Sequence, residues 1–325
     1  MAGTLQRMTW QGLDAWTLEG ERLRVVVIPL LGAKIVSLLD KRTGGEWLAG
    51  PGTRPLKPLE YGAAFERQDM SGWDEMFPTI SACPYPGPGP AHGVALPDHG
   101  EVWALPWTVE EAAAGSLRLS VAGRALPYTL ARTLSLSAPD TLLFQYHLTN
   151  HDPEPLPYLW TAHPQFACGA GARIVLPPEV TQVCNALPPA WGWGEPERRF
   201  GWPLAQRVDG QPQRIDEVRG PAQRQARKFY TLPDAHIGSA AVVREETGDW
   251  LHLAWNPDAI PYFGLWVDEG RLHHEAVAAP EPATGFYDSL ARAFEKQEVQ
   301  VLGPGATTTW SLTAQVGSAP LSVIG

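Results

Sequence analysis

Short β-like segments recur along almost the whole chain, and they constrain the fold more than any other feature of the sequence. Each is rich in β-branched and aromatic residues, and most are bounded by Gly, Pro, Asn or Asp. The predicted strands are Leu23–Ile28, Lys34–Leu39, Glu46–Leu48, Ser116–Val121, Tyr128–Leu136, Thr141–Thr149, Leu156–Thr161, Ala240–Arg244, Trp250–Trp255, Phe263–Val267, Gln297–Leu302 and Thr307–Gln315. No amphipathic helix of convincing length interrupts them, and no repeat of fixed period appears. The pattern therefore predicts an all-β protein, an antiparallel sandwich or barrel.

Charge and hydropathy exclude several classes of protein. The net charge of −10 argues against nucleic acid or an anionic membrane as a partner, because clustered Lys and Arg supply those contacts. No segment reaches the roughly 18 uninterrupted apolar residues of a membrane helix. The N-terminus lacks the pattern of a signal peptide, so we expect a cytoplasmic protein. The basic residues are scattered along the chain, and only segment 214–228 contains several close together. That segment also holds acids and glutamines, so we expect a solvated excursion there.

Two segments without strand-like patterns are long enough to form functional loops. They span residues 51–107 and 177–202, and the second places Trp191, Trp193 and Trp202 among Gly and Pro. A loop tryptophan suits a sugar ring, whose C–H face packs on the aromatic face while its hydroxyl groups meet polar side chains. The alternative is that most of the 14 tryptophans belong to the core, since Trp is highly buried on average.

Glu281 is the carboxylate whose backbone is most restricted. It lies in the stretch AAPEPATGFYDSL, residues 278–290, where Pro282 confines Glu281 to extended backbone angles. Turn residues follow at 284–285, and a short capped helix is expected through 291–296. We therefore expect Glu281 at the end of a strand that enters a loop. It would act there as a general base or a ligand-binding acid, and the alternative is a surface Glu beside a turn.

Two histidines stand in similar positions. His99 lies in DHGEVW and His163 in WTAHPQFACG, each just past a β-like run with Gly or Pro beside it. Both imidazoles could converge with Glu281. Histidine can give or accept a proton near neutral pH, and a neighbouring carboxylate would raise its pKa so that it stays charged. Structural hydrogen bonds are the expected role of His92, His147, His151, His236 and His252.

The sequence shows no metal or nucleotide motif. In the run His273–Glu275, consecutive side chains on a strand would face opposite ways, and no HExxH or other zinc spacing accompanies it. Cys83, Cys168 and Cys184 are isolated, so neither a disulfide framework nor a zinc knuckle is implied. A P-loop, a GxGxxG motif and a GxSxG elbow are all missing. We therefore expect neither a metal nor a cofactor.

Taken together, several segments resemble the aldose 1-epimerase, or galactose mutarotase-like, superfamily. They are LRVVVIPLLGAKIVSLLDKRTGGEWL, GWDEMFPTI with PDHGEVW, WTAHPQF, and PEPATGFYDSL with LGPGATTTWSLTAQV. Their order and spacing carry the resemblance, which covers nearly the whole chain. It implies a large single-domain antiparallel β-sandwich over residues 1–325.

The resemblance also implies catalytic roles. The catalytic Glu of the family falls on Glu281, its proton-donating His on His163, and its first active-site His on His99. Mutarotation needs only such groups: a base takes the proton of the anomeric hydroxyl, and an acid protonates the ring oxygen. A metal or nucleotide is not required.

The substrate-binding residues follow the family less closely. Arg67 is the nearest candidate for the Arg that grips sugar hydroxyls, but the region reads FERQDMSGWDEMFPTI, without the usual asparagine–arginine pair. The acidic residues Asp74 and Glu75 are expected to supply part of that hydroxyl binding. Trp160, beside His163, is a further expected substrate contact.

Three classes of function remain open from the sequence. The first is an isomerase that acts at the anomeric carbon of a free or modified sugar. The second is a sugar-binding or regulatory protein on the same fold, and the third is a carbohydrate lyase or hydrolase with the same acid–base pair. The expected partner is a small sugar bound by a monomer or homodimer. Phosphorylated sugars are not expected to be preferred, because the chain is acidic and its loop beside His99 is rich in proline.

Overall fold

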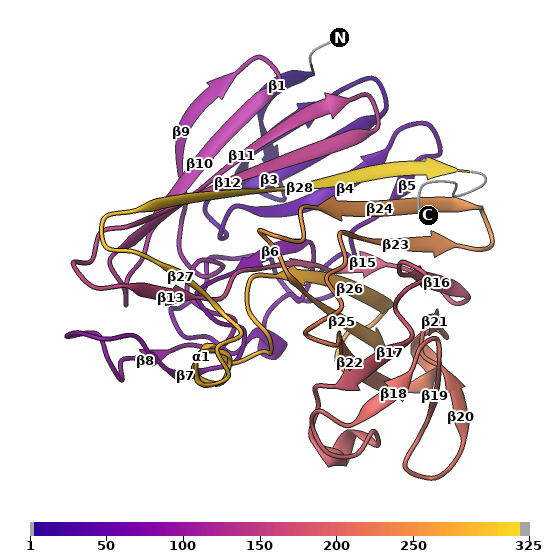
Figure 1. Ribbon diagram of the computed structural model, residues 1–325. Helices are drawn as coiled ribbons and strands as arrows, with labels where there is room; N and C mark the ends of the chain where they lie inside the picture. Colours follow the sequence, from indigo (N-terminus) through magenta and orange to yellow (C-terminus); the bar gives the residue numbers. More distant parts are fainter. Residues whose placement is uncertain (1–2, 319–325) are drawn as a thin grey trace.

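Two large antiparallel sheets form most of the protein (Figure 1). The structure is a computed structural model that describes residues 3–318. In the larger sheet the strand order is β1 (Thr4–Trp10), β2 (Leu13–Glu19), β3 (Leu23–Ile28), β4 (Lys34–Asp40), β6 (Trp73–Met76), β14 (Thr161–Pro164), β26 (Ala276–Ala283), β25 (Tyr262–Glu269), β22 (Gln225–Thr231), β17 (Gln182–Asn185) and β18 (Arg199–Gly201), with β5 (Gly45–Glu46) beside β4 and β15 (Phe166–Ala167) beside β26.

The smaller sheet has the order β21 (Glu217–Val218), β16 (Ala172–Val175), β23 (Ser239–Arg244), β24 (Asp249–Trp255), β28 (Thr307–Ser318), β12 (Thr141–Asn150), β11 (Tyr128–Ala138), β10 (Ser116–Ala122) and β9 (Thr108–Ala113). Two-stranded ribbons join β13 (Leu156–Tyr158) to β27 (Gln300–Leu302), β19 (Leu204–Gln206) to β20 (Pro212–Arg214), and β7 (Cys83–Pro84) to β8 (Ala95–Leu96). The helical turns are η1 (Phe65–Arg67), η2 (Pro189–Trp191), η3 (Pro221–Gln223) and α1 (Leu290–Glu295).

The sheets pack face to face over a shared apolar core, which confirms the predicted all-β sandwich. Trp73 of β6 stacks on Phe144 of β12 with ring centroids 4.6 Å apart. On β28, seen in yellow between β12 and β24 in Figure 1, Trp310 and Leu312 are buried while Ser311 is exposed. This alternation fits a strand with one face on the core and one face toward solvent.

Strand β26 differs from the sequence prediction. Glu281 was expected at a strand end, but it lies inside this buried strand, with Gly264 of β25 opposite it. The prolines at 280 and 282 are tolerated because β26 has no ladder partner at residues 279–282 on its other side: β15 pairs with Ala278 and β14 pairs with Ala283. Beside the same interruption, His163 of β14 approaches Glu281 to 3.8 Å.

Other differences have simple causes. Strands β1 and β2 were missed; β1 is an edge strand whose polar residues at positions 4, 6, 7 and 9 are exposed, which breaks the alternation of a strand pattern. Strand β22 was missed because its first residues were assigned to a solvated segment, whereas its positions 226–231 are buried. The predicted short helix is present as α1, capped by the Ser289 hydroxyl, which accepts from the Arg292 backbone N–H. None of the helices within residues 3–318 is long and apolar enough to cross a membrane.

Candidate active site

A cleft of about 390 Å³ lies on the larger sheet, on the face turned away from the smaller sheet. Strand β6 shows on which face of the larger sheet the cleft lies. Glu75 points toward the smaller sheet, where it contacts Arg132 and Tyr146, so its neighbour Asp74 points to the opposite face. His163 is the register partner of Asp74 and shares that outer face. The cleft is lined by Glu281, His163 and His99 together with side chains from the two long loops.

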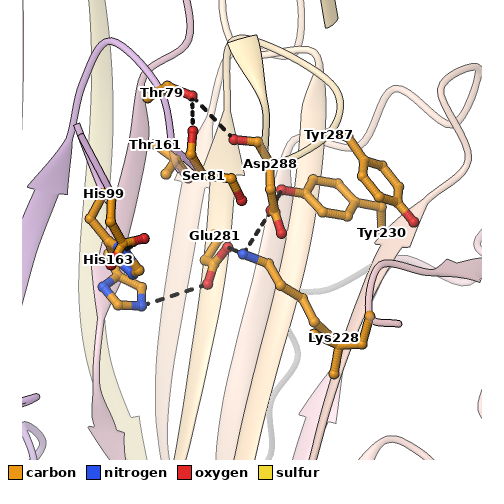
Figure 2. A network of polar contacts seen from close by, with 12 residues as sticks. Thr79, Ser81, His99, Thr161, His163, Lys228, Tyr230, Glu281, Tyr287 and Asp288 are labelled. Atoms are coloured by element: carbon orange, nitrogen blue, oxygen red, sulfur yellow. Dashed lines mark hydrogen bonds and ion pairs between the residues drawn. The ribbon is translucent and has the colours of Figure 1, made fainter. Parts of the chain in front are cut away.

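The structure brings the three sequence-predicted catalytic residues together (Figure 2). Glu281 Oε1 lies 3.8 Å from His163 Nε2, and the two residues are 1% and 3% exposed. Both lie on strands, Glu281 on β26 and His163 on β14, rather than on loop ends. His99 alone lies in a loop. Its Nδ1 is 2.9 Å from Asp98 Oδ1, and its ring centroid is 5.4 Å from that of His163.

Burial reverses the expected order of the two pKa values. It raises the pKa of Glu281 to about 7, against the lowering effect of nearby Lys228. It also lowers the pKa of His163 well below its ordinary value, and the neighbouring His99, Lys228 and Lys34 lower it further. The expectation that a carboxylate keeps His163 charged is therefore wrong for this arrangement. Between the two pKa values, the pair Glu281–His163 holds one proton.

Gln165 sets the environment of His163 from the β14–β15 connection. Its side-chain nitrogen lies 2.8 Å from His163 Nε2, which suits an amide N–H donating to an unprotonated ring nitrogen. Nδ1 of His163 has no protein partner within the described chain, although it is buried. The imidazole therefore has one nitrogen engaged by the protein and one without a protein partner.

Lys228 of β22 is the main residue that sequence reasoning missed. Its Nζ lies 2.8 Å from Glu281 Oε2 and 2.9 Å from Asp288 Oδ1, and the Tyr230 hydroxyl donates to the same Asp288 oxygen at 2.5 Å (Figure 2). Burial alone would lower the pKa of Lys228, but Asp288 and Glu281 outweigh it, so the pKa is raised and the ammonium stays charged. The only sequence signal was its place directly before the apolar residues that continue β22.

Gly264 makes the contact between Lys228 and Glu281 possible. It lies on β25, the strand between β22 and β26, and pairs with Tyr230 on one side and Glu281 on the other. A Cβ at this position would lie 3.1 Å from the Tyr230 ring and 3.2 Å from Glu281 Oε2. The missing side chain therefore leaves space for the carboxylate and the ammonium to meet above the sheet.

Asp74, Glu75 and Trp160 do not line the cleft, contrary to the sequence expectation. Glu75 is buried between the sheets, where it accepts hydrogen bonds from Arg132 at 2.7 Å, Tyr146 at 2.9 Å and Trp160 at 2.7 Å. Consecutive strand residues face opposite ways, so the pair could not act on one ligand.

Asp74 lies opposite His163 on the neighbouring strand and is also buried. Its Oδ2 is 3.0 Å from the Lys34 ammonium, which also contacts Asp69 at 2.5 Å. Burial raises the pKa of Asp74 to about 7, and Asp69 adds to the effect while Lys34 opposes it. These contacts assign Asp74 to an internal charge cluster of the sheet.

Arg67 is also outside the cleft. It is exposed at the end of η1 and lines a separate surface hollow with Arg54 and Lys57. Its neighbour Phe65 points into the cleft and stacks on His99, with ring centroids 4.2 Å apart. The sequence thus pointed to the correct segment but to the wrong side chain, because the short helical turn directs residues two positions apart to different sides.

The loop tryptophans divide between core and cleft. Trp191 lines the cleft together with Trp266 of β25, and the two half-buried rings meet edge to face with centroids 6.0 Å apart. Trp193 is buried against Phe229, and Trp202 packs on the core. One of the three loop tryptophans therefore offers an aromatic face to a ligand. Among residues 3–318, no group of three or more His, Cys, Asp or Glu side chains is placed to hold a metal ion.

Comparison with solved structures defines the class of fold. A galactose mutarotase-like protein from Lactobacillus casei ATCC 334 superposes with a TM-score of 0.69 at 17% identity, covering 93% of this chain and 100% of the other. A galactose mutarotase related enzyme from Lactobacillus acidophilus gives 0.66 at 14% identity, covering 94% and 98%. A galactose mutarotase-like protein from Clostridium acetobutylicum gives 0.65 at 12% identity, covering 98% and 99%.

This protein therefore has the galactose mutarotase-like fold. No family model matches the sequence, and no curated protein matches it either. A fold shared at this level of identity does not fix function. Activity therefore has to be inferred from the cleft itself, where Glu281, His163 and Lys228 lie together.

Proposed function

We propose that this protein is a mutarotase of the aldose 1-epimerase type, which interconverts the anomers of a sugar by opening and closing its ring. The observation that carries the proposal is the Glu281–His163 pair: a carboxyl group and an imidazole 3.8 Å apart, buried in a cleft with aromatic walls. The likeness of the fold to galactose mutarotase-like proteins supports the same activity.

The proposed reaction uses one proton on this pair, in the form with Glu281 ionised and His163 protonated, which is the reverse of the form that the two pKa values favour at rest. Glu281 takes the proton of the anomeric hydroxyl while His163 gives a proton to the ring oxygen, so the C1–O5 bond breaks and C1 becomes an aldehyde. Rotation about C1–C2 presents the other face of the carbonyl. The ring oxygen then attacks C1, returns its proton to His163, and the new hydroxyl takes a proton from Glu281. Positioned proton transfer of this kind contributes about 10²- to 10⁴-fold.

Lys228 has a supporting role in this proposal. Its ammonium holds the Glu281 carboxylate through Oε2, which leaves Oε1 directed at His163. The positive charge also favours the ionised form of Glu281, without which the base would remain protonated at neutral pH. Lys228 is therefore a positioning residue for the base.

The sugar would lie between aromatic walls and polar groups. Trp191 and Trp266 supply apolar faces for the C–H side of a ring, while His99 and Asp288 are polar groups that line the same cleft. An open chain must rotate inside the site, and the cleft volume of about 390 Å³ is of the size used for small ligands.

Anomer-exchange NMR over a panel of aldoses tests the proposal. Saturable acceleration of exchange, with no other product, is expected for at least one aldose. Binding without exchange would show a sugar-binding protein instead, and the appearance of cleaved products would show a lyase or hydrolase. Either result would refute the mutarotase.

A further inference from the structure

A second cavity, of about 360 Å³, lies beside the cleft. The two share Leu272 as a common wall. Trp191 and Arg271 connect them further, because Trp191 lines the cleft and Arg271 of the second cavity lies over its ring, 3.9 Å from the centroid. A ligand whose sugar ring occupies the cleft could therefore extend past Leu272 into the second cavity.

Three arginines line this second cavity, and none forms an ion pair with a carboxylate of the described chain. They are Arg54, Arg224 and Arg271. His274 also lines it and lies 3.0 Å from Glu275, so the nearby acid is already engaged by the imidazole. The result is a concentration of positive charge in a protein whose net charge is −10.

Two of the guanidinium groups are held in place by the protein. Arg54 donates to the backbone carbonyls of Glu66, Gln68 and Leu272 at 3.2, 2.8 and 3.1 Å, contacts that fix its position without neutralising its charge. Arg271 is oriented by the Trp191 ring. Cations that are positioned in advance lose less conformational freedom when a ligand binds.

The loop that carries Arg271 is also held in shape. The Asp268 carboxylate accepts the backbone N–H groups of Arg271, Leu272 and His273 at 2.7 to 3.0 Å. Gly270 lets this loop lie against η3, since a Cβ there would fall 2.0 Å from the Pro221 carbonyl oxygen. Close contact with η3 brings Arg224, which follows that turn, to the same cavity.

We propose that the second cavity is an anion subsite, which binds the phosphate or carboxylate group of an acidic aldose whose ring lies in the cleft. Arginine forks match both groups bidentately. The cleft itself cannot hold an anion well, because four acids line it against the single ammonium of Lys228, namely Glu66, Asp98, Glu281 and Asp288. The inference rests on the mutarotase proposal for its sugar, and it revises the expectation that phosphorylated sugars are not preferred. Net charge describes the whole chain and does not describe this cavity.

The test is binding of inorganic phosphate to the full chain, measured by isothermal titration calorimetry at low ionic strength. We expect wild type to bind phosphate and the double variant Arg224→Gln/Arg271→Gln to bind it at least about tenfold more weakly, the range expected for lost charge-assisted hydrogen bonds. Arg7→Gln is the matched control. Arg7 also lies over a tryptophan, Trp16, at 5.0 Å, but on the distant strand β1. Wild type that binds no phosphate, or an equal loss in Arg7→Gln, would overturn the subsite.

Anomer exchange distinguishes the two anion sources. Each of glucose 6-phosphate and glucuronate is compared with glucose, and we expect at least one acid to have a higher kcat/KM than glucose in wild type. That ratio should fall about tenfold in Arg224→Gln/Arg271→Gln and stay constant in Arg7→Gln. If neither glucose 6-phosphate nor glucuronate has a higher kcat/KM than glucose, the anion subsite is refuted, even if glucose is a good substrate. If the protein accelerates anomer exchange of no aldose, the mutarotase proposal is refuted, and the phosphate-binding experiment alone then tests the anion subsite.

Discussion

Lys228 and Glu281 are in contact, with Nζ 2.8 Å from Oε2, although their strands β22 and β26 are separated by β25. The contact passes over Gly264, the residue of β25 that has no side chain to block it. This cation acts on both members of the acid–base pair, because it lowers the pKa of Glu281 and also that of His163. The pH dependence of activity should therefore depend on Lys228.

We expect wild-type kcat/KM to follow a bell in pH, with its alkaline limb near pH 7. The pair works with one proton. Above the pKa of Glu281, about 7, the pair holds none, and below the lowered pKa of His163 it holds two. A pH profile of anomer exchange at low substrate concentration measures both limbs. A profile that keeps rising above pH 8 would contradict this assignment.

Lys228→Met should move both limbs to higher pH. Removal of the cation raises the pKa of Glu281 and of His163 together, by about one to three units for a charge at this distance. The same profile measures the shift. Lys41→Met is the control, since Lys41 is paired with Glu19 at 2.6 Å on the surface. An unshifted profile in Lys228→Met would show that the ammonium does not act on the pair.

Glu281→Gln should lower kcat by at least about 100-fold while sugar affinity changes little, because the amide keeps the shape but cannot accept the proton. His163→Asn should behave likewise. The double variant should be little worse than either single variant, because the two groups act as a unit. Exchange kinetics and calorimetric sugar binding check these expectations.

His99→Asn serves as the comparison for the pair. Its ring lines the cleft next to His163 without contact with Glu281, so we expect a larger effect on KM than on kcat. Losses that simply add in the Glu281→Gln/His163→Asn variant would contradict a shared proton.

Trp191→Ala should raise KM for a neutral aldose by about threefold to tenfold, the range for one lost aromatic contact, with a smaller effect on kcat. A neutral sugar is chosen because Arg271 also rests on this ring. Trp16→Ala, which removes a half-buried tryptophan from β2, should leave KM unchanged. An unchanged KM in Trp191→Ala would show that the sugar does not pack on this loop.

Asp74→Asn should flatten the dependence of stability on pH between about 4 and 7. The native pKa of Asp74 is about 7, above the ordinary value, so the folded state binds more protons than the unfolded state in this window. That contribution is complete at low pH and is lost as pH rises, with a slope of up to about 1.4 kcal/mol per pH unit. Reversible urea unfolding at several pH values measures it.

The control for this experiment is Asp14→Asn, at an exposed position on β2. An equal change of slope in both variants would contradict the assignment to Asp74. Because Asp74 does not line the cleft, Asp74→Asn should also change KM little.

Much of the fold could be predicted because local patterns carry it. Strands β3, β10 and β28 follow β-branched or alternating sequences that end at turn residues, and such signals need no knowledge of distant residues. Strands β22 and β26 were hidden from the same reasoning. One contains Arg227 and Lys228 and the other contains two prolines, and each is a strand only because its neighbours in the larger sheet cover it.

The candidate site could be predicted only in part. The sequence offered Glu281, His163 and His99, because acid, imidazole and turn residues are visible locally, and the cleft contains all three. It could not separate Asp74 and Glu75 from ligand-binding acids, since their partners Lys34 and Arg132 are 40 and 57 residues away. It also could not select Phe65 over Arg67, which are two residues apart on η1.

The sequence by itself determined the all-β character, the short strands and the residue types that can move a proton. Tertiary structure alone decided the charge state of those residues. Glu281 and His163 have their altered pKa values because both are buried, and because Lys228, distant in sequence, lies beside them. Desolvation and Coulomb interactions act through space, so residues that are 53 or 65 positions apart set each other's protonation only after the sheet has formed.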